Sequence, residues 1–331
     1  MLGFNRIILS RKGFDSSAGG GFSPFEPHTG KYIVLPIPQD AEESYIGNKL
    51  KYEEIKIKNS HFEGYNESNL KELMNRIGSW PPKIKRNNPE YAHFDPWLGS
   101  CPWLSKNNDH HMGAFGQVSG AQTILCKNEV VEGSLFLFFS RFKPINWTEV
   151  SKFDDIDINH EHIKAGLYFI YGWLRVGKII QRFDHIHSNL EEMEAKELVR
   201  HPHATPEYFE KYEKKRGKNT IYIADKNLFE NSTKVDGCGY FTKLSKNLLL
   251  TATDSAQEHC SEKWLPSRWK MPPGFSFETC LSYLKDEPKW IRTKDGSYLV
   301  QHKGPGQEFV FKGSDEFSQW FKDILLLEMR K

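Results

Sequence analysis

A histidine and an aspartate stand two residues apart in a stretch rich in aromatic side chains, His93-Phe94-Asp95-Pro96. A carboxylate under a sugar ring can stabilise the positive charge that develops as an N-glycosidic bond breaks, and it can orient the attacking water. A histidine can donate to the departing base, and an aromatic neighbour such as Trp97 can hold a flipped nucleotide. The motif therefore predicts a catalytic centre for base excision, although a turn before Pro96 with the aromatic residues in the core explains it equally well.

The segment that starts at Ser10, SRKGFDSSAGG, carries two cations, three hydroxyls, one acid and several glycines. Arginine and lysine neutralise phosphate, and exposed backbone N–H groups add further donors. The spacing of a nucleotide-binding P-loop, G-x-x-x-x-G-K-[ST], is missing. A loop that grips phosphate or sugar is therefore expected, while a solvated turn capped by Ser and Asp side chains is the alternative. The expected phosphate contacts are Ser10, Arg11, Lys12, Ser16 and Ser17.

Other residues could take part in the same chemistry. Asp15, in this loop, competes with Asp95 for the role of the catalytic acid. Gln117 can pair with a base edge through its amide, and Phe115, two positions before it, is expected to contact the base as well. Arg268, in the motif WLPSRW, is a candidate phosphate contact.

Histidines recur in pairs with H-x-H spacing. The pairs are His160/His162, His185/His187 and His201/His203. On a strand, such residues share a face and could bind a metal ion. No cysteine has a matching spacing, however, and the H-E-x-x-H and deaminase signatures are both missing. We therefore expect most of these histidines at the surface, with no metal site and no cofactor.

Two strongly apolar segments, 133–142 and 167–179, are expected to form the centre of the fold that positions these residues. Both are aromatic and β-branched and are bounded by glycines or charges, which is typical of buried strands. A first strand is expected at 5–10, and helices at 70–80, 189–198, 206–217 and 314–331. The stretch 81–103 lacks periodicity and is expected to be an ordered loop or a connector.

Composition excludes some classes of protein. With 38% hydrophobic and 27% charged residues, the 331-residue chain can bury a sizeable core. The 45 basic and 43 acidic side chains give no overall basic field, so contact with nucleic acid requires a local patch. There is no run of 18 apolar residues and no signal-peptide pattern, and the five cysteines form no C-x-x-C pair. A cytoplasmic protein with free thiols and no membrane contact is expected.

The two central segments resemble a known strand pair. GSLFLFFSRF followed by YFIYGWLRVGKI is similar to the paired strands of PUA-like barrels, the group that includes the EVE and ASCH domains. That resemblance implies an α+β fold, with either a β-rich mixed sheet or a PUA-like barrel core at about 113–252, and peripheral helices. It also implies a pocket for a modified base beside these strands, with Tyr171 and Trp173 among the base contacts. An ordinary sheet core is the alternative.

A wider resemblance covers most of the chain. The matching segments, in chain order, are ILSRKGFDSSAGG, LPIP, HFDP, FGQ, GSLFLFFSRF, YGWLRVG, HPH, NTIYIA, WLPSRW and GQEFV. Together they resemble the third class of nucleotide-modification-associated domains. The resemblance implies one domain over 1–331 in a bacterial or phage-related protein that works with modified bases in DNA. It also implies that His201 and His203 of the HPH segment contact phosphate or the leaving base. Residues 39–90 match nothing and are an unassigned insert.

The residues and the resemblance together predict an enzyme of antiviral defence. It would recognise a hypermodified base in phage DNA and excise it by hydrolysing the N-glycosidic bond, which leaves an abasic site. DNA with modified bases is the expected partner, and no obligate protein partner is expected. Two alternatives stay open: a non-catalytic reader of modified bases, and an enzyme that builds or trims modified nucleotides.

Overall fold

The computed structural model describes most of the chain. The described residues are 3–14, 21–40, 49–59, 61–79, 87–105, 110–145, 152–153, 156–157, 165–215, 217–230, 232–252, 268–284, 289–293, 296–301 and 307–329. Asp15, Ser16 and Ser17 lie outside these ranges, so the predictions made for them are not addressed by the structure.

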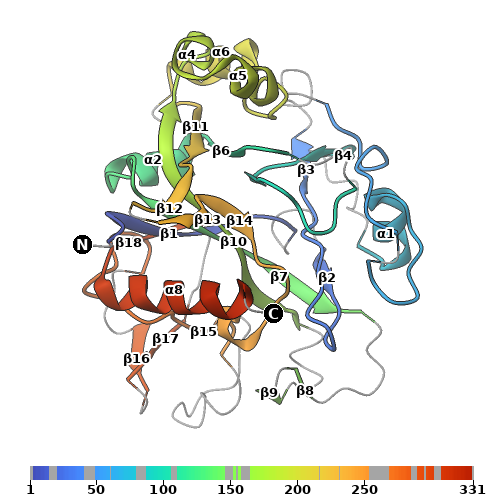
Figure 1. Cartoon of the computed structure of the whole chain (residues 1–331), viewed down its shortest axis with the longest axis vertical. Helices are drawn as coiled ribbons and strands as arrows, with labels where there is room; N and C mark the ends of the chain where they lie inside the picture. The colour runs from blue at the N-terminus through green and yellow to red at the C-terminus, as the bar shows by residue number, and fades with distance from the viewer. Residues whose placement is uncertain are drawn as a thin grey trace.

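The main sheet has nine strands and a mixed topology (Figure 1). Its path runs β18 (Glu308–Lys312), β1 (Arg6–Arg11), β7 (Leu135–Pro144), β10 (Leu167–Ile180), β11 (Thr220–Ala224), β6 (Gly113–Gln117) and β5 (Trp97–Leu98). Off this path, β14 (Cys238–Tyr240) pairs with β10, and β2 (Ser23–Phe25) pairs with β7. β1 and β2 run parallel to β7, and the other pairs are antiparallel.

The two apolar segments are confirmed as the central strands. The first six residues of β7 are fully buried, and β10 is buried over most of its length. A strand covered on both faces needs a continuous apolar run rather than an alternating one. β7 and β10 pair with each other from Leu167↔Phe142 to Arg175↔Leu135.

The fold is α+β with a mixed sheet, as the sequence predicts. The alternative, a PUA-like barrel, is wrong for the described strands, because β18 and β5 end the sheet without pairing to each other. β1 pairs with the central strand β7, and β18 pairs with the other edge of β1. The sheet centre therefore also uses strands from outside residues 113–252.

Helices cover the sheet and its ends (Figure 1). α8 (Asp315–Met329) packs through Phe317 and Phe321 on Phe4, and Phe321 also contacts Trp173 of β10. A group at another edge of the molecule contains α4 (Asp184–Asn189), α5 (Glu192–Leu198) and α6 (Pro206–Glu213). α2 (Ser119–Lys127) follows β6 directly, and a short 3₁₀ helix, η3, spans Lys246–Leu248.

Residues 39–90, which the sequence leaves unassigned, contain α1 (Leu70–Arg76). The segment is bounded by β3 (Ile37–Asp40) and β4 (Asn87–His93), which pair with each other. The small remaining sheets are formed by β12 (Asn227–Phe229) with β13 (Ser232–Asp236), β8 (Lys152–Phe153) with β9 (Ile156–Asp157), and β15 (Arg268–Lys270), β17 (Tyr298–Gln301) and β16 (Trp290–Arg292).

Some local predictions are wrong. The stretch 81–103 is not irregular where it is described, since it contains β4 and β5, whose partners lie far away in the sequence. The helix expected at 189–198 is α5, but it begins after Glu191, because Asn189 is the last residue of the preceding helix α4 and not an N-cap. No helix among the described residues is long and apolar enough to cross a membrane.

Candidate functional site

Asp95 lies where β4 leads into β5. The pairing Trp97↔Ala114 between β5 and β6 brings Asp95 beside Gly116, two residues further along β6. The side chain of Asp95 accepts a hydrogen bond from the Gly116 backbone N–H through Oδ1, at 3.1 Å. Only 2% of this side chain is exposed. The carboxylate is therefore fixed by the edge of the main sheet.

His201, in the loop between α5 and α6, is the second donor to this carboxylate. Its Nε2 lies 3.0 Å from Asp95 Oδ1, and its Nδ1 accepts the backbone N–H of His203 at 3.2 Å. Because Nδ1 must be unprotonated to accept, the proton of the neutral ring is on Nε2. His201 therefore donates to Asp95, and Oδ1 is satisfied by two donors.

His203 is oriented by Asn219, which precedes β11. The Asn219 amide Nδ2 donates to the His203 carbonyl at 2.8 Å, which leaves Asn219 Oδ1 to face His203 Nδ1 at 2.9 Å. An amide oxygen only accepts, so Nδ1 of His203 carries the proton. The lone pair of the neutral ring is then on Nε2.

That lone pair points toward His93 and Asp95. The two histidine Nε2 atoms are 3.1 Å apart, and each lies 3.9 Å from Asp95 Oδ2. Among the described residues, none donates a hydrogen bond to Oδ2 within ordinary distance. The side chain of His93 is 13% exposed and so reaches solvent. His93, Asp95 and His203 form a group whose ligand atoms could hold a metal ion.

Burial and charge set the protonation of this cluster. Burial raises the pKa of Asp95, but the hydrogen bond from His201 and the charges of the three histidines outweigh it and lower that pKa to about 2. Burial lowers the pKa of His93 to about 4 and that of His203 to about 3. At neutral pH the site therefore holds an ionised carboxylate beside neutral His93 and His203.

Gly116 is required for this packing. A Cβ atom at Gly116 would lie 2.2 Å from Cγ of His203 and 2.8 Å from its Cβ. The imidazole of His203 thus rests directly on the β6 backbone. The glycine of the Phe115-Gly116-Gln117 segment serves close approach, as glycines inside strands often do.

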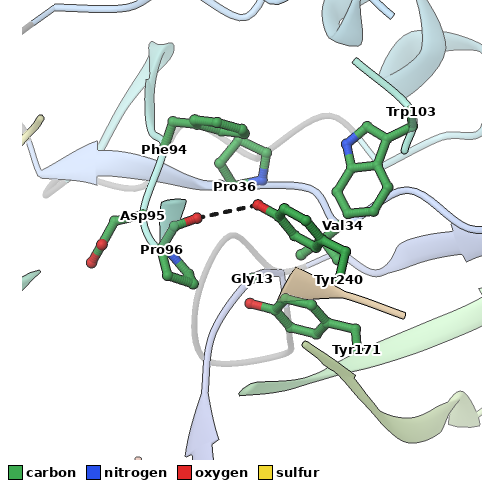
Figure 2. A pocket seen from close by; sticks show the side chains of 9 residues that line it. All are labelled: Gly13, Val34, Pro36, Phe94, Asp95, Pro96, Trp103, Tyr171 and Tyr240. Carbon is green, nitrogen blue, oxygen red and sulfur yellow. Dashed lines mark hydrogen bonds between the residues drawn. The ribbon is translucent and has the colours of Figure 1, made fainter. Parts of the chain in front are cut away.

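A pocket opens beside Asp95 (Figure 2). Its cavity volume is about 20 Å³, which is room for about one water molecule, so a larger ligand could enter only after lining side chains move. Its lining residues are Gly13, Val34, Pro36, Phe94, Asp95, Pro96, Trp103, Tyr171 and Tyr240. The wall is aromatic and mostly apolar, and the Asp95 carboxylate is turned away from its aromatic side chains (Figure 2).

Tyr171 presents an unused hydroxyl to this pocket. The register of β10 with β7 shifts between Ile170 and Gly172, so Tyr171 occupies a β-bulge. Bulges re-aim side chains and are common next to active sites. The Tyr171 hydroxyl is buried and has no hydrogen-bond partner among the described residues, whereas that of Tyr240 donates to the Pro96 carbonyl (Figure 2). Tyr171 was expected to contact a base, and the structure places it where that could occur.

Lys12 and Gln117 meet at a buried carboxylate. Lys12 Nζ lies 3.3 Å from Glu308 Oε1, and Gln117 Nε2 donates to the same oxygen at 2.5 Å. Lys12 also lies over the ring of Phe115, at 4.7 Å from its centroid. The amide oxygen of Gln117 accepts the Val118 N–H. The expected phosphate contact Lys12 and base contact Gln117 therefore have internal partners.

The other predicted site residues lie in different surroundings. Trp97 packs against the cluster: it stacks on His110 at 3.8 Å and meets His201 edge-on. Ser10 is buried in β1 beside Arg11. Arg268 is 2% exposed in β15, within the small C-terminal sheet.

Trp173 faces a larger cleft. That cleft has an empty volume of about 1770 Å³ and also contains Glu194, Glu197, Asp225 and Asp236. Four carboxylates repel phosphate, so this cleft is a poor match for DNA. The pocket beside Asp95 is the better candidate.

The sequence does not predict that Asn219 orients His203 or that Glu308 pairs with Lys12 and Gln117. It also does not predict that His93 and His203 lie side by side. His93 ends β4 and Asp95 follows two residues later, so their spacing along an extended chain was a usable signal for side chains on one face. The H-x-H pairs contain no carboxylate, so their spacing gives no sign that Asp95 completes a group of possible metal ligands. His201 and His203, the pair that the resemblance assigns to the site and not to the surface, are buried.

Comparison with known proteins gives one match. The family model of nucleotide modification associated domain 3 matches residues 6–312. Neither the curated proteins nor the solved structures gave a match. The matched range includes every residue of the Asp95 cluster. The chain therefore belongs to the nucleotide modification associated domain 3 family.

Proposed function

We propose that this protein is an enzyme that excises a modified base from DNA, with Asp95 at its centre. Membership of the family supports association with nucleotide modification. One observation carries the choice of reaction: a buried, ionised carboxylate has one oxygen satisfied by His201 and Gly116, while its other oxygen accepts no hydrogen bond from the described residues. That arrangement matches what hydrolysis of an N-glycosidic bond requires.

The proposed reaction is hydrolysis of the bond between the base and C1′ of its sugar. Water adds its oxygen to C1′ of the sugar, and the bond between C1′ and the base breaks. The electron pair of that bond leaves with the base, which takes up a proton from solvent. Asp95 orients the water and stabilises the positive sugar. The proton that the water releases passes to solvent through His93, the most exposed member of the cluster.

The residues that line the pocket are suited to contact a base once side chains move to admit it, because the cavity itself holds about one water molecule. Tyr171, Tyr240 and Trp103 supply aromatic surface, and the free hydroxyl of Tyr171 can bond a polar edge or substituent. A flipped base placed there would have its sugar near Asp95. A hypermodified pyrimidine, such as a glucosylated hydroxymethylcytosine of phage DNA, is the proposed substrate, and antiviral defence in the cytoplasm is the proposed role.

The test uses phage DNA that contains glucosylated hydroxymethylcytosine, with unmodified DNA of similar length as the control substrate. Abasic sites are counted after alkaline cleavage, and the released base is identified by mass spectrometry. We expect release from modified DNA, and a loss of about 10²–10⁴-fold in rate for Asp95→Asn. The asparagine keeps an acceptor oxygen for His201 and Gly116, so its fold is expected to survive.

Asp184→Asn is the matched control, because Asp184 is an exposed acid on α4 with its side chain 62% exposed. It is expected to retain full activity. Binding of modified DNA that survives Asp95→Asn, without any released base, would instead identify a reader. Activity on free modified nucleotides alone would favour an enzyme of nucleotide synthesis or trimming.

A further inference from the structure

Three lone pairs converge at the Asp95 cluster. Asn219 holds the proton of His203 on Nδ1, so Nε2 of His203 is an acceptor. His201 and Gly116 occupy Oδ1 of Asp95, so Oδ2 has both lone pairs free of described donors. The neutral ring of His93 can carry its proton on Nδ1, which leaves a third lone pair on its Nε2.

The three atoms have the spacing of metal ligands. Their separations are 3.1 Å between the two Nε2 atoms and 3.9 Å from each of these to Oδ2. In a triangle with these sides, the point equidistant from the corners lies about 2.1 Å from each. Metal–nitrogen and metal–oxygen bonds of zinc and similar ions are about 2.0–2.2 Å long. One point therefore lies at bonding distance from all three atoms in their present positions.

The outer contacts are those that metal ligands use. A histidine ligand commonly donates its other ring N–H to an oxygen acceptor, which fixes its orientation, as Asn219 does for His203. A ligating carboxylate is commonly hydrogen-bonded through its second oxygen, as Asp95 is by His201 and Gly116. These contacts hold the donor atoms in place before an ion arrives.

We propose that His93 Nε2, Asp95 Oδ2 and His203 Nε2 bind one divalent first-row transition-metal ion. Two imidazoles and one carboxylate suit zinc, iron(II), cobalt(II) or manganese(II), and they leave coordination positions open for water or substrate. Calcium and magnesium prefer oxygen ligands and fit this donor set poorly. The exposed edge of His93 gives the ion a route from solvent.

This metal site does not depend on base excision. A bound ion would lower the pKa of a coordinated water and supply a hydrolytic nucleophile, in place of a water that Asp95 alone orients. The same ion would serve a trimming reaction on a free nucleotide. Metal binding is measured without any substrate, so failure of the proposed function leaves the result unaffected.

The experiment uses the full-length chain without a histidine tag, stripped by chelator and dialysed. ZnCl₂ is titrated by calorimetry, and CoCl₂ is followed by its d–d absorption. We expect one ion of either metal per chain. His93→Gln is expected to weaken binding by at least about 100-fold, since it removes a direct ligand at a partly exposed position.

Asn219→Ala tests the positioning residue. It is expected to weaken binding by about 10–100-fold and to shift the cobalt absorption bands, because the His203 ring is no longer held by its Nδ1 proton. His187→Gln, at an exposed histidine of α4, is the matched control and is expected to bind as the unchanged chain does. Circular dichroism verifies that each variant folds.

Absence of one-to-one binding of both ions to the folded, unchanged chain would overturn the proposal. The proposal would also be overturned if folded His93→Gln bound the ions as tightly as the unchanged chain does. In either case the cluster would be a hydrogen-bonded group in which His93 donates to His203.

Discussion

Replacing Gly116 with alanine tests whether the His203 imidazole really rests on the β6 backbone. The new Cβ atom would lie 2.2 Å from Cγ and 2.3 Å from Cδ2 of His203, far inside contact distance. Either the ring or the strand must move. The ring is held by Asn219 and the strand by Ile221 of β11, so neither has an easy alternative position.

The expected cost is about 1–3 kcal/mol of unfolding free energy, the usual range for overpacking a buried site. Displacement of the ring also breaks the bond to Asn219, and this contributes about 1 kcal/mol more. The assay is equilibrium denaturation in urea, followed by tryptophan fluorescence. Metal affinity is measured on the same samples and is expected to fall, because His203 Nε2 leaves its position.

Gly120→Ala is the matched control. Gly120 is exposed in α2, four residues along the chain, and a Cβ there would meet nothing within 4 Å. Alanine in a helix is expected to stabilise by up to about 1 kcal/mol. Equal unfolding free energies for the two variants would refute the packing described at Gly116, and with it the placement of His203.

Three other predictions concern single side chains. Burial lowers the pKa of His61 to about 4, below its usual 6.5, against the opposing hydrogen bond to the Tyr32 carbonyl. Between these two pH values His61 is protonated in the unfolded chain but neutral in the folded one. Its contribution to the unfolding free energy is therefore complete above pH 6.5 and falls by up to about 3 kcal/mol toward pH 4. Urea denaturation at several pH values should show a smaller fall for His61→Asn. Tyr171→Phe is expected to leave the unfolding free energy unchanged within about 0.5 kcal/mol, because the hydroxyl has no described partner. The same variant is expected to bind modified DNA more weakly. A loss of more than about 1 kcal/mol of unfolding free energy would mean that the hydroxyl is hydrogen-bonded in the folded protein. Glu308→Gln should lower the unfolding free energy by about 3 kcal/mol, because it leaves the nearly buried Lys12 without its counter-charge. Adding Lys12→Met to this variant should restore part of the lost stability, which a double-mutant cycle measures.

The sequence could predict what depends on local pattern. The central strands β7 and β10 can be predicted from the sequence, because a strand buried on both faces needs an unbroken apolar run. The shared face of His93 and Asp95 follows from their spacing of two residues on an extended chain. α6 starts as expected at Pro206, with Thr205 as its cap.

The rest of the site depends on contacts between distant segments. His203 comes 110 residues after His93, and Asn219 is a further 16 residues along the chain. No local spacing shows that these side chains meet, because the meeting is produced by β6 lying between β5 and β11. The same cause explains β4 and β5, whose residues lack periodicity and are ordered by partners elsewhere.

The place of β1 in the sheet has a consequence for how the chain folds. β1 pairs with β18, so residues from near the two ends of the chain must find each other before this part of the sheet is complete. Contacts of such long sequence separation slow folding. During synthesis, one edge of β1 stays unpaired until β18 has been made, about 300 residues later, and an unpaired apolar edge invites aggregation. Production at low temperature, with slow synthesis and chaperone help, should therefore raise the yield of folded protein.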